Sequence, residues 1–160
     1  MDSEVANGVR LLAARSEHAE EAADVIVRSR EAYLPYAPMV HSVDETRCWM
    51  RDVLIPGGGV TLALRGQAIV GVLAISTEAG VGWVDQLYLL PGAPGEGIGS
   101  LLLAHALTQL PQTVRLHTFQ ENTRARRFYE QRGFVPVAFT DGRDNEERCP
   151  DVLYEYRQPD

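Results

Sequence analysis

Cysteine is scarce in this sequence, and the two residues present, Cys48 and Cys149, are not spaced as a metal-binding or redox pair. The sequence also lacks a run of about 18 apolar residues, the length that a membrane-spanning helix requires. Its first ten residues are acidic, whereas a secretory signal has a basic start followed by an apolar stretch. These absences predict a cytoplasmic protein without a disulfide framework, a metal site or a membrane segment.

Basic residues are fewer than acidic ones: the chain has 15 Lys and Arg but 22 Asp and Glu, which gives a formal net charge of −7. This charge opposes nonspecific binding to nucleic acid or anionic lipid, so neither is an expected partner. What the 160 residues do contain is 45% hydrophobic residues, enough for a packed core. No linker, repeat or low-complexity segment interrupts them, and we expect a single domain over residues 1–160.

The first third of the chain has mainly helical spacing. A short strand at 9–15 is followed by Ser16, which we interpret as the N-cap of an amphipathic helix over 17–33. A Pro-rich segment ends that helix. Ser42 and Glu45 have the spacing of a capping box, which predicts a second helix up to the glycines at 57–59.

From residue 59 onward the period changes to that of strands. A hairpin is expected first, and two strand–helix–strand units follow it. The expected strands are 59–65, 67–76, 81–90, 113–119, 134–140 and 151–156, and the expected helices run over 98–109 and from Asn122 to Gly133. The pattern predicts a mixed α/β (α+β) fold.

A glycine-rich loop precedes the helix at 98–109. Gly95, Gly97 and Gly99 let backbone N–H groups approach a ligand closely, and the start of the helix adds the positive end of its dipole. That combination suits a diphosphate, although three glycines alone are equally typical of a tightly packed loop. The loop has no lysine for a Walker A motif, and no acidic residue at the position of a dinucleotide fingerprint.

Asn122 and Tyr129 form the second motif. They are seven residues apart, two turns of helix, and therefore share one face. Taken singly, Asn122 is most simply a helix cap and Tyr129 a core aromatic residue.

In this order and spacing, the two motifs resemble those of the GNAT superfamily of acyl-CoA-dependent N-acetyltransferases. The residues that carry the resemblance are Leu87–Leu89, Pro94 to Gly99, Asn122, Ala125, Tyr129, Gly133 and Phe134. The resemblance implies a GNAT-like mixed, mostly antiparallel central sheet of about seven strands, splayed in the middle and flanked by about four helices. It also implies transfer of an acetyl group from acetyl-CoA, without a metal, to an amine of a small molecule or peptide. A homodimer is compatible with it, although no residue specifies an interface.

The resemblance assigns the binding of acetyl-CoA to one set of positions: Leu87, Leu89, Pro94, Gly95, Gly97, Gly99, Ser100, Asn122 and Arg126. Where the family usually has Arg or Gln, this chain has Pro94, and Glu96 stands where a basic residue is frequent. The loop side chains therefore add no positive charge. Backbone N–H groups would hold the diphosphate, aided by Arg126 or Arg127.

Tyr129 matches the family position that protonates the leaving thiolate, a task that suits a phenol with a reference pKa of about 10. His117 is the best candidate for the base that deprotonates the amine, with packing as its alternative role. Weaker alternatives are Glu78, Asp85 and Gln86, and in many family members water serves. On the acceptor side we expect Tyr33, Tyr36, His41 and the acidic loop at 141–151.

Two other function classes stay open at this point. Pro94 and Glu96 keep open a non-catalytic acyl-CoA-binding sensor or interaction module, whereas Asn122 and Tyr129 together argue against it. A nucleotide-binding α/β domain would require ATP or NAD as the preferred ligand.

Overall fold

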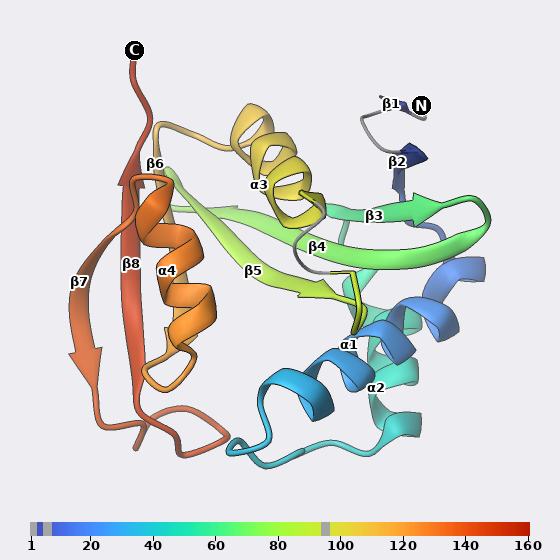
Figure 1. The fold of residues 1–160 in the computed structure, drawn as a ribbon, viewed down its shortest axis with the longest axis horizontal. Coiled ribbons are helices and arrows are strands. Elements are labelled where there is room, and N and C mark those ends of the chain that lie inside the picture. Colours follow the sequence, from blue (N-terminus) through green and yellow to red (C-terminus); the bar gives the residue numbers. More distant parts are fainter. Residues whose placement is uncertain (1–2, 5–7, 94–96) are drawn as a thin grey trace.

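The computed structural model describes residues 3–4, 8–93 and 97–160. Its strands form one sheet in the order β1-β2-β3-β4-β5-β6-β8-β7 (Figure 1). Neighbouring strands are antiparallel, apart from β5 and β6, which are parallel. The strands are β1 (Ser3–Glu4), β2 (Val9–Ala13), β3 (Val60–Arg65), β4 (Ala68–Glu78), β5 (Val81–Leu89), β6 (Thr113–Phe119), β7 (Val135–Thr140) and β8 (Asp151–Arg157).

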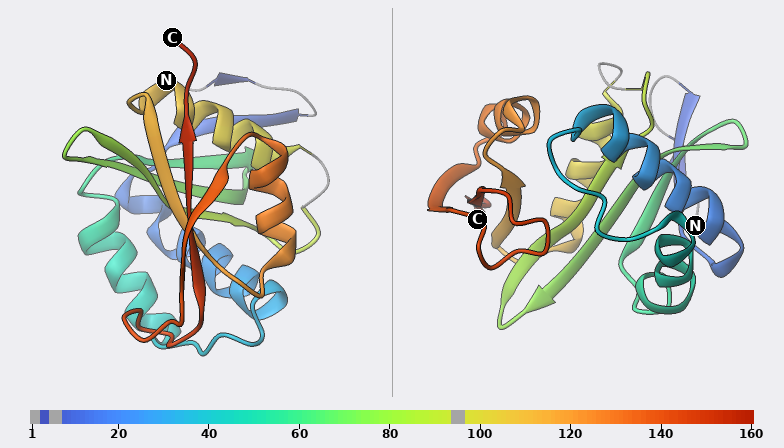
Figure 2. Two further views of the ribbon diagram at one scale, coloured as in Figure 1. Left: turned by 90° about the vertical axis from the view of Figure 1, so that its left-hand side faces the viewer. Right: turned by 90° about the horizontal axis from the view of Figure 1, so that it is seen from below.

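Helices cover both faces of this sheet. The four α-helices are α1 (Ala19–Tyr33), α2 (Val43–Trp49), α3 (Ile98–Gln109) and α4 (Thr123–Gln131). A 3₁₀ turn, η2 (Ser16–His18), precedes α1, and a π-helical turn, η3 (Met50–Leu54), extends α2. Helices α1 and α2 lie on one side of β3 and β4, and α3 lies on the other (Figures 1 and 2).

Two apolar cores result, one on each face. Because successive side chains of a strand point to opposite faces, Val72 of β4 packs into the core that contains Ile26 of α1, whereas Leu73 joins the core that contains Leu102 of α3. The α3 core continues under α4 to Tyr154 of β8. It therefore connects the two halves of the sheet and fixes the helices that surround the site.

The observed fold confirms the mixed, mostly antiparallel sheet with flanking helices; the eighth strand, β1, has only two residues. The capping box of α2 is also confirmed, because the Glu45 N–H donates to Ser42 Oγ at 3.0 Å and the Ser42 N–H donates to the Glu45 carboxylate at 2.8 Å. The N-cap assigned to Ser16 is wrong. Ser16 lies inside the 3₁₀ turn, where the Arg15 N–H donates to Nδ1 of His18 at 2.9 Å.

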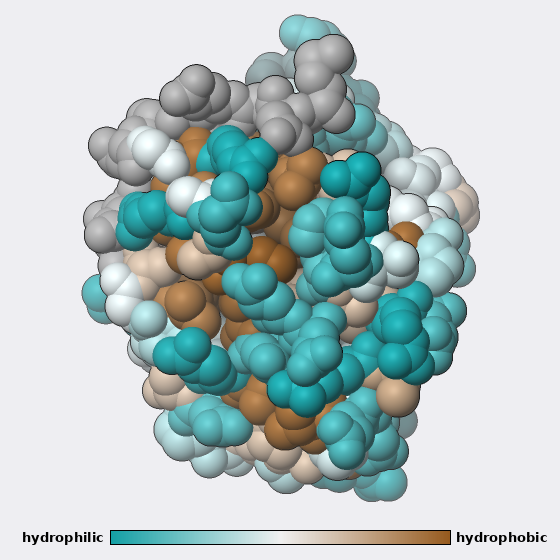
Figure 3. All heavy atoms as spheres, turned by 90° about the vertical axis from the view of Figure 1, so that its right-hand side faces the viewer, coloured by the Kyte–Doolittle hydropathy of each residue, from teal (hydrophilic) through white to brown (hydrophobic). Residues whose placement is uncertain are grey.

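The face drawn in Figure 3 intersperses hydrophilic and apolar side chains. Within the described ranges, no helix has the length and apolar character needed to cross a membrane.

Candidate active site

The candidate site lies where β5 and β6 separate. In the described sheet these strands share two residue pairs, Gly82 with Val114 and Trp83 with Arg115. The register of β5 against β4 also shifts, which leaves Asp85 as an extra residue on β5. Such a bulge bends and twists a strand. Beyond it the two strands diverge, as the family resemblance implied, and a cavity of about 520 Å³ opens between them.

The backbone of β5 is directed into this gap. The Leu90 N–H donates to the Val70 carbonyl of β4 at 2.9 Å. Because N–H groups of successive strand residues point to opposite edges, those of Leu87 and Leu89 point away from β4, toward the gap. In the described sheet β6 does not pair with β5 at these two alternate donors, so they can bind an extended ligand as an added strand would.

Two cavities meet at this point. The β5–β6 cavity, of about 520 Å³, has His117 and Gln86 in its walls, and the α3–α4 cavity, of about 470 Å³, has Gly97 and Ser100. The residues that line both are Leu34, Leu87, Tyr88, Asn122, Ala125 and Tyr129. The two cavities are therefore adjacent, with these side chains between them.

Tyr129 is one of two tyrosines at the junction, the other being Tyr88. Tyr129 projects from α4 and is only 7% exposed, with its ring 5.6 Å from that of Phe134 and 5.2 Å from that of Phe128, centroid to centroid. Asn122 accepts the Ala125 N–H at 3.2 Å and so starts the helix that carries Tyr129. Burial is the main cause that raises the pKa of Tyr129, and the nearby Tyr88 raises it further. The phenol therefore keeps its proton at neutral pH.

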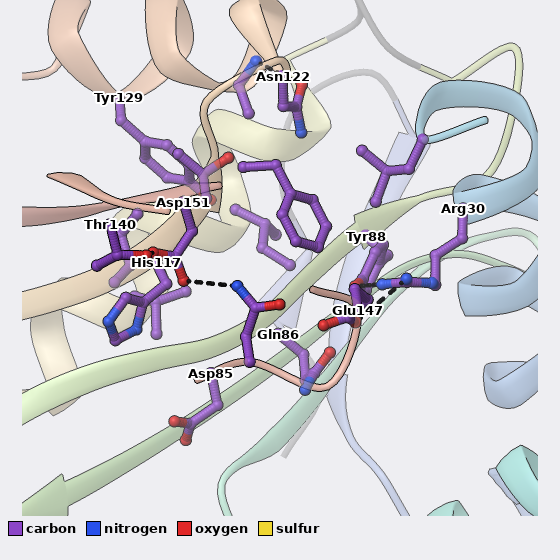
Figure 4. A pocket seen from close by; sticks show the side chains of 18 of the residues that line it. Arg30, Asp85, Gln86, Tyr88, His117, Asn122, Tyr129, Thr140, Glu147 and Asp151 are labelled. Carbon is purple, nitrogen blue, oxygen red and sulfur yellow. Dashed lines mark hydrogen bonds and ion pairs between the residues drawn. The ribbon is translucent and has the colours of Figure 1, made fainter. Parts of the chain in front are cut away.

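His117 of β6 lines the β5–β6 cavity (Figure 4), and because its neighbour Leu116 packs in the core with Tyr129, the His117 side chain points to the opposite face of the sheet. Its ring stacks on that of Trp83, with centroids 5.5 Å apart and planes 13° apart. The side chain is exposed to solvent, so it can exchange a proton with bulk water. Of the weaker candidates for the base, Asp85 and Gln86 line the same cavity as His117. Glu78, at the end of β4, is absent from its described lining.

The residues expected to bind acetyl-CoA are largely brought together. Those that line the α3–α4 cavity are Leu87, Leu89, Gly97, Gly99, Ser100 and Asn122. Gly97 starts α3 with a φ of +80°, and a Cβ atom there would stand in open space, so a ligand can approach its backbone. Pro94 and Gly95 lie outside the described residues.

Arg126 is not brought to this cavity. Its Nε donates to the Tyr154 hydroxyl at 2.9 Å and its Nη1 to the Gln120 carbonyl at 3.3 Å, so the guanidinium is held against β8. Two other arginines of the same segment, Arg124 and Arg132, line the α3–α4 cavity instead. Sequence reasoning missed them, because the direction of a side chain near a helix end depends on the packing around it.

The loop between β7 and β8 covers the other end of the site. Arg30 of α1 donates to the Glu147 carboxylate at 3.3 Å and to the Tyr88 hydroxyl at 3.1 Å, and both Arg30 and Glu147 line the β5–β6 cavity (Figure 4). Nearby, His41 and Glu146 form an exposed pair at 3.0 Å. The sequence predicted the loop as part of the acceptor side, but the Arg30–Glu147 pair joins residues 117 positions apart and leaves no local signal.

The remaining residues expected on the acceptor side are dispersed. Tyr33 lines the α3–α4 cavity, whereas His41 lines a neighbouring cavity of about 340 Å³ together with Glu146. The hydroxyl of Tyr36 is buried and has no hydrogen-bond partner among the described residues. Burial is the main reason why the pKa of Tyr36 rises to about 12. Within the part of the chain that the structure describes, no group of three or more His, Cys, Asp or Glu could hold a metal ion.

The splayed sheet, the glycine-started α3 and the tyrosine at the junction of two cavities define an acyl-CoA-dependent transferase fold. The sequence model of the acetyltransferase (GNAT) family matches residues 24–134. The chain belongs to this family.

Individual relatives are more distant. Mycothiol acetyltransferase of Beutenbergia cavernae is 42% identical over 65 residues, which cover 38% of this chain and 22% of that protein. The match thus spans about a fifth of the relative's length. Two solved structures have the same fold. Ard1 of Thermoplasma volcanium has a TM-score of 0.75 at 15% identity, covering 96% of this chain and 99% of the other. The PaiA N-acetyltransferase of Thermoplasma acidophilum, in complex with coenzyme A, has a TM-score of 0.72 at 18% identity, covering 93% and 98%.

Proposed function

We propose that this protein is an N-acetyltransferase that moves the acetyl group of acetyl-CoA directly to an amine of a small molecule or a peptide. The observation that carries the proposal is the position of Tyr129, buried where the β5–β6 and α3–α4 cavities meet. Each cavity holds one substrate, and the proton donor stands between them. Membership in the acetyltransferase family supports the reaction class.

The α3–α4 cavity fits the cosubstrate. Acetyl-CoA supplies, when bound, an acetyl group activated as a thioester and a thiolate leaving group. The N–H groups at the start of α3 bind its diphosphate, with Gly97 leaving room for a close approach. The N–H groups of Leu87 and Leu89 bind the extended arm and hold the thioester beside Tyr129. A backbone N–H at this place also stabilises negative charge on the carbonyl oxygen as the amine attacks.

Tyr129 and His117 divide the proton transfers. Tyr129 donates its proton to the departing thiolate, whose conjugate thiol has a pKa of about 8.5. An alkyl amine has a pKa of about 10.4 and arrives protonated, so it needs a base. His117, exposed in the β5–β6 cavity, accepts that proton directly or through water. One proton of the amine therefore leaves through His117 toward solvent, and the proton that the nitrogen loses after attack restores the Tyr129 phenol.

A thermal-shift assay with acetyl-CoA, CoA, ATP and NAD tests the choice of cosubstrate. Binding to the native state raises the unfolding midpoint by an amount set by ligand concentration relative to the dissociation constant. We expect acetyl-CoA and CoA to raise it and the two nucleotides to leave it unchanged. A shift with ATP or NAD alone would instead point to a nucleotide-binding domain.

We also propose a cytoplasmic homodimer. Both cysteines are free, as is usual in a reducing compartment. In the described sheet β7 is an edge strand, and three large apolar side chains on it are exposed: Val135, Val137 and Phe139. Exposed apolar side chains on an edge strand can pack against another chain, while Pro136 and the register shift beside Val137 limit backbone pairing there. A second copy that pairs at β7 would cover this edge.

A further inference from the structure

The described lining of the α3–α4 cavity is positively charged, in a protein whose net charge is −7. Its described lining contains two arginines, Arg124 and Arg132, and no Asp or Glu. The β5–β6 cavity has the opposite character, because its lining includes four carboxylates, Asp85, Asp144, Glu147 and Asp151. A cleft lined by one sign of charge attracts ligands of the other. The α3–α4 cavity therefore favours an anion.

Arg132 is fixed beside the first turn of α3. Its Nη1 donates to the Phe128 carbonyl at 2.9 Å, its Nη2 donates to Ser100 Oγ, and its guanidinium lies 3.8 Å from the centroid of the Phe128 ring. Ser100 belongs to the first turn of α3, whose backbone N–H groups have no partner within the helix. The positive charge of the Arg132 guanidinium therefore lies beside the N–H groups at the start of α3.

The guanidinium also keeps donors for a ligand. A guanidinium carries five N–H groups, and the two bonds described use two of them. Stacking on Phe128 holds the planar group without consuming its hydrogen bonds. Arg124, eight residues earlier on α4, lies over the Tyr33 ring at 4.8 Å from its centroid and adds a second positive charge to the cavity.

We propose that Arg132 binds the diphosphate of CoA, with Arg124 as an additional positive charge on the same cavity. The assignment rests on the proposed function, since it takes CoA as the ligand. It explains how the chain can dispense with a basic side chain in the glycine loop, where Pro94 and Glu96 stand. The positive charge is supplied instead by Arg124 of α4 and by Arg132, which directly follows α4.

Calorimetric titration of Arg132→Ala with CoA and with dephospho-CoA tests the proposal, and ligand-observed NMR with pantetheine provides the comparison without a diphosphate. Arg127, which the sequence suggested as an aid to diphosphate binding, is absent from the described lining of this cavity; it is exposed on α4 and lines a separate cavity with Arg126 and Glu130, so Arg127→Ala is the matched control. We expect Arg132→Ala to weaken CoA and dephospho-CoA alike by about 10- to 100-fold, the range for losing one charge-assisted hydrogen bond. Pantetheine binding, and every affinity of Arg127→Ala, should stay within about twofold.

Each contrary result has its own meaning. If wild type binds CoA and Arg132→Ala binds it equally well, the inference is overturned while the proposed function stands. A loss for CoA but not for dephospho-CoA would move Arg132 to the 3′-phosphate and overturn the diphosphate assignment. An equal loss for pantetheine would show that Arg132 only supports the fold, an outcome that Arg132→Lys would check by retaining the charge. If wild type fails to bind CoA, the proposed function falls first.

Discussion

At the scale of single residues, the proposed reaction needs two properties of Tyr129: it retains its proton, and it lies at the junction of the two cavities. Burial gives it the first property, by raising its pKa, and the helix that begins at Asn122 gives it the second. Its ring also belongs to the α3 core, next to Phe134 and Tyr154. A substitution that removes only the hydroxyl can therefore distinguish the proposed acid role of Tyr129 from its packing role.

Tyr129→Phe removes the hydroxyl and keeps the ring. We expect kcat to fall about 10²- to 10⁴-fold, the usual contribution of a positioned acid, with KM for acetyl-CoA and the unfolding midpoint nearly unchanged. Steady-state measurement of thiol release, together with a thermal melt, checks this. A variant that keeps more than about half of the wild-type kcat would remove Tyr129 from the reaction.

The raised pKa of Tyr129 also predicts a pH profile. The acid acts in its protonated form, and its pKa lies above the ordinary value of 10.0, so the protonated fraction does not fall between pH 7 and pH 10. The kcat profile should rise with pH as the acceptor amine or its base loses a proton, and then reach a plateau. An alkaline decline below pH 10 that disappears in Tyr129→Phe would contradict the burial argument.

At the scale of elements, the site depends on contacts between segments that are far apart in the sequence. The Asn122–Tyr129 spacing, the capping box at Ser42 and the period change at residue 59 are local signals, and the elements that they predict are present. The Arg30–Glu147 pair and the position of Arg132 follow only from tertiary packing. The N-cap prediction at Ser16 is wrong. The Arg15 N–H donates to the side chain of His18, three residues later, and Ser16 lies inside the 3₁₀ turn that ends at His18.

Glu147→Gln should loosen the β7–β8 loop from α1. The Arg30 and Glu147 side chains are only 13% and 15% exposed, so the change leaves a largely buried guanidinium without its charged partner. We expect a loss of about 1–3 kcal/mol in the free energy of unfolding, and a rise in KM for the acceptor but not for acetyl-CoA. Urea unfolding and two-substrate kinetics measure the two effects.

Glu146→Gln is the control for this loop. Its pair with His41 is 55% and 53% exposed, so we expect a change within about 0.5 kcal/mol. If both variants lose the same stability, burial of the Arg30–Glu147 pair is not what holds the loop.

At the scale of the whole molecule, the exposed apolar side chains of β7 predict a dimer. Light scattering should give twice the chain mass of 17.7 kDa. Val137→Glu should shift the protein toward monomer by placing charge at the paired edge, whereas Val53→Glu, at a similarly exposed position of η3, should not. A monomer at every concentration would exclude pairing at β7.

The whole sequence also simplifies the test of activity, because all 15 of its basic residues are arginines and none is lysine. Acetyl groups found on a protein or peptide acceptor therefore cannot be confused with acetylation of the enzyme's own lysine side chains. Labelled acetyl-CoA can be used with peptide and small-amine acceptors alike.

The measurement that tests the central claim most directly is acetyl transfer itself, followed as thiol release from acetyl-CoA over a panel of small amines and peptides, with mass spectrometry of the acceptor. We predict that at least one amine gives equal amounts of free thiol and N-acetylated product, and that Tyr129→Phe abolishes most of both. Tight binding of acetyl-CoA without turnover on any amine would contradict the account, and would identify the protein as an acyl-CoA sensor on the same fold.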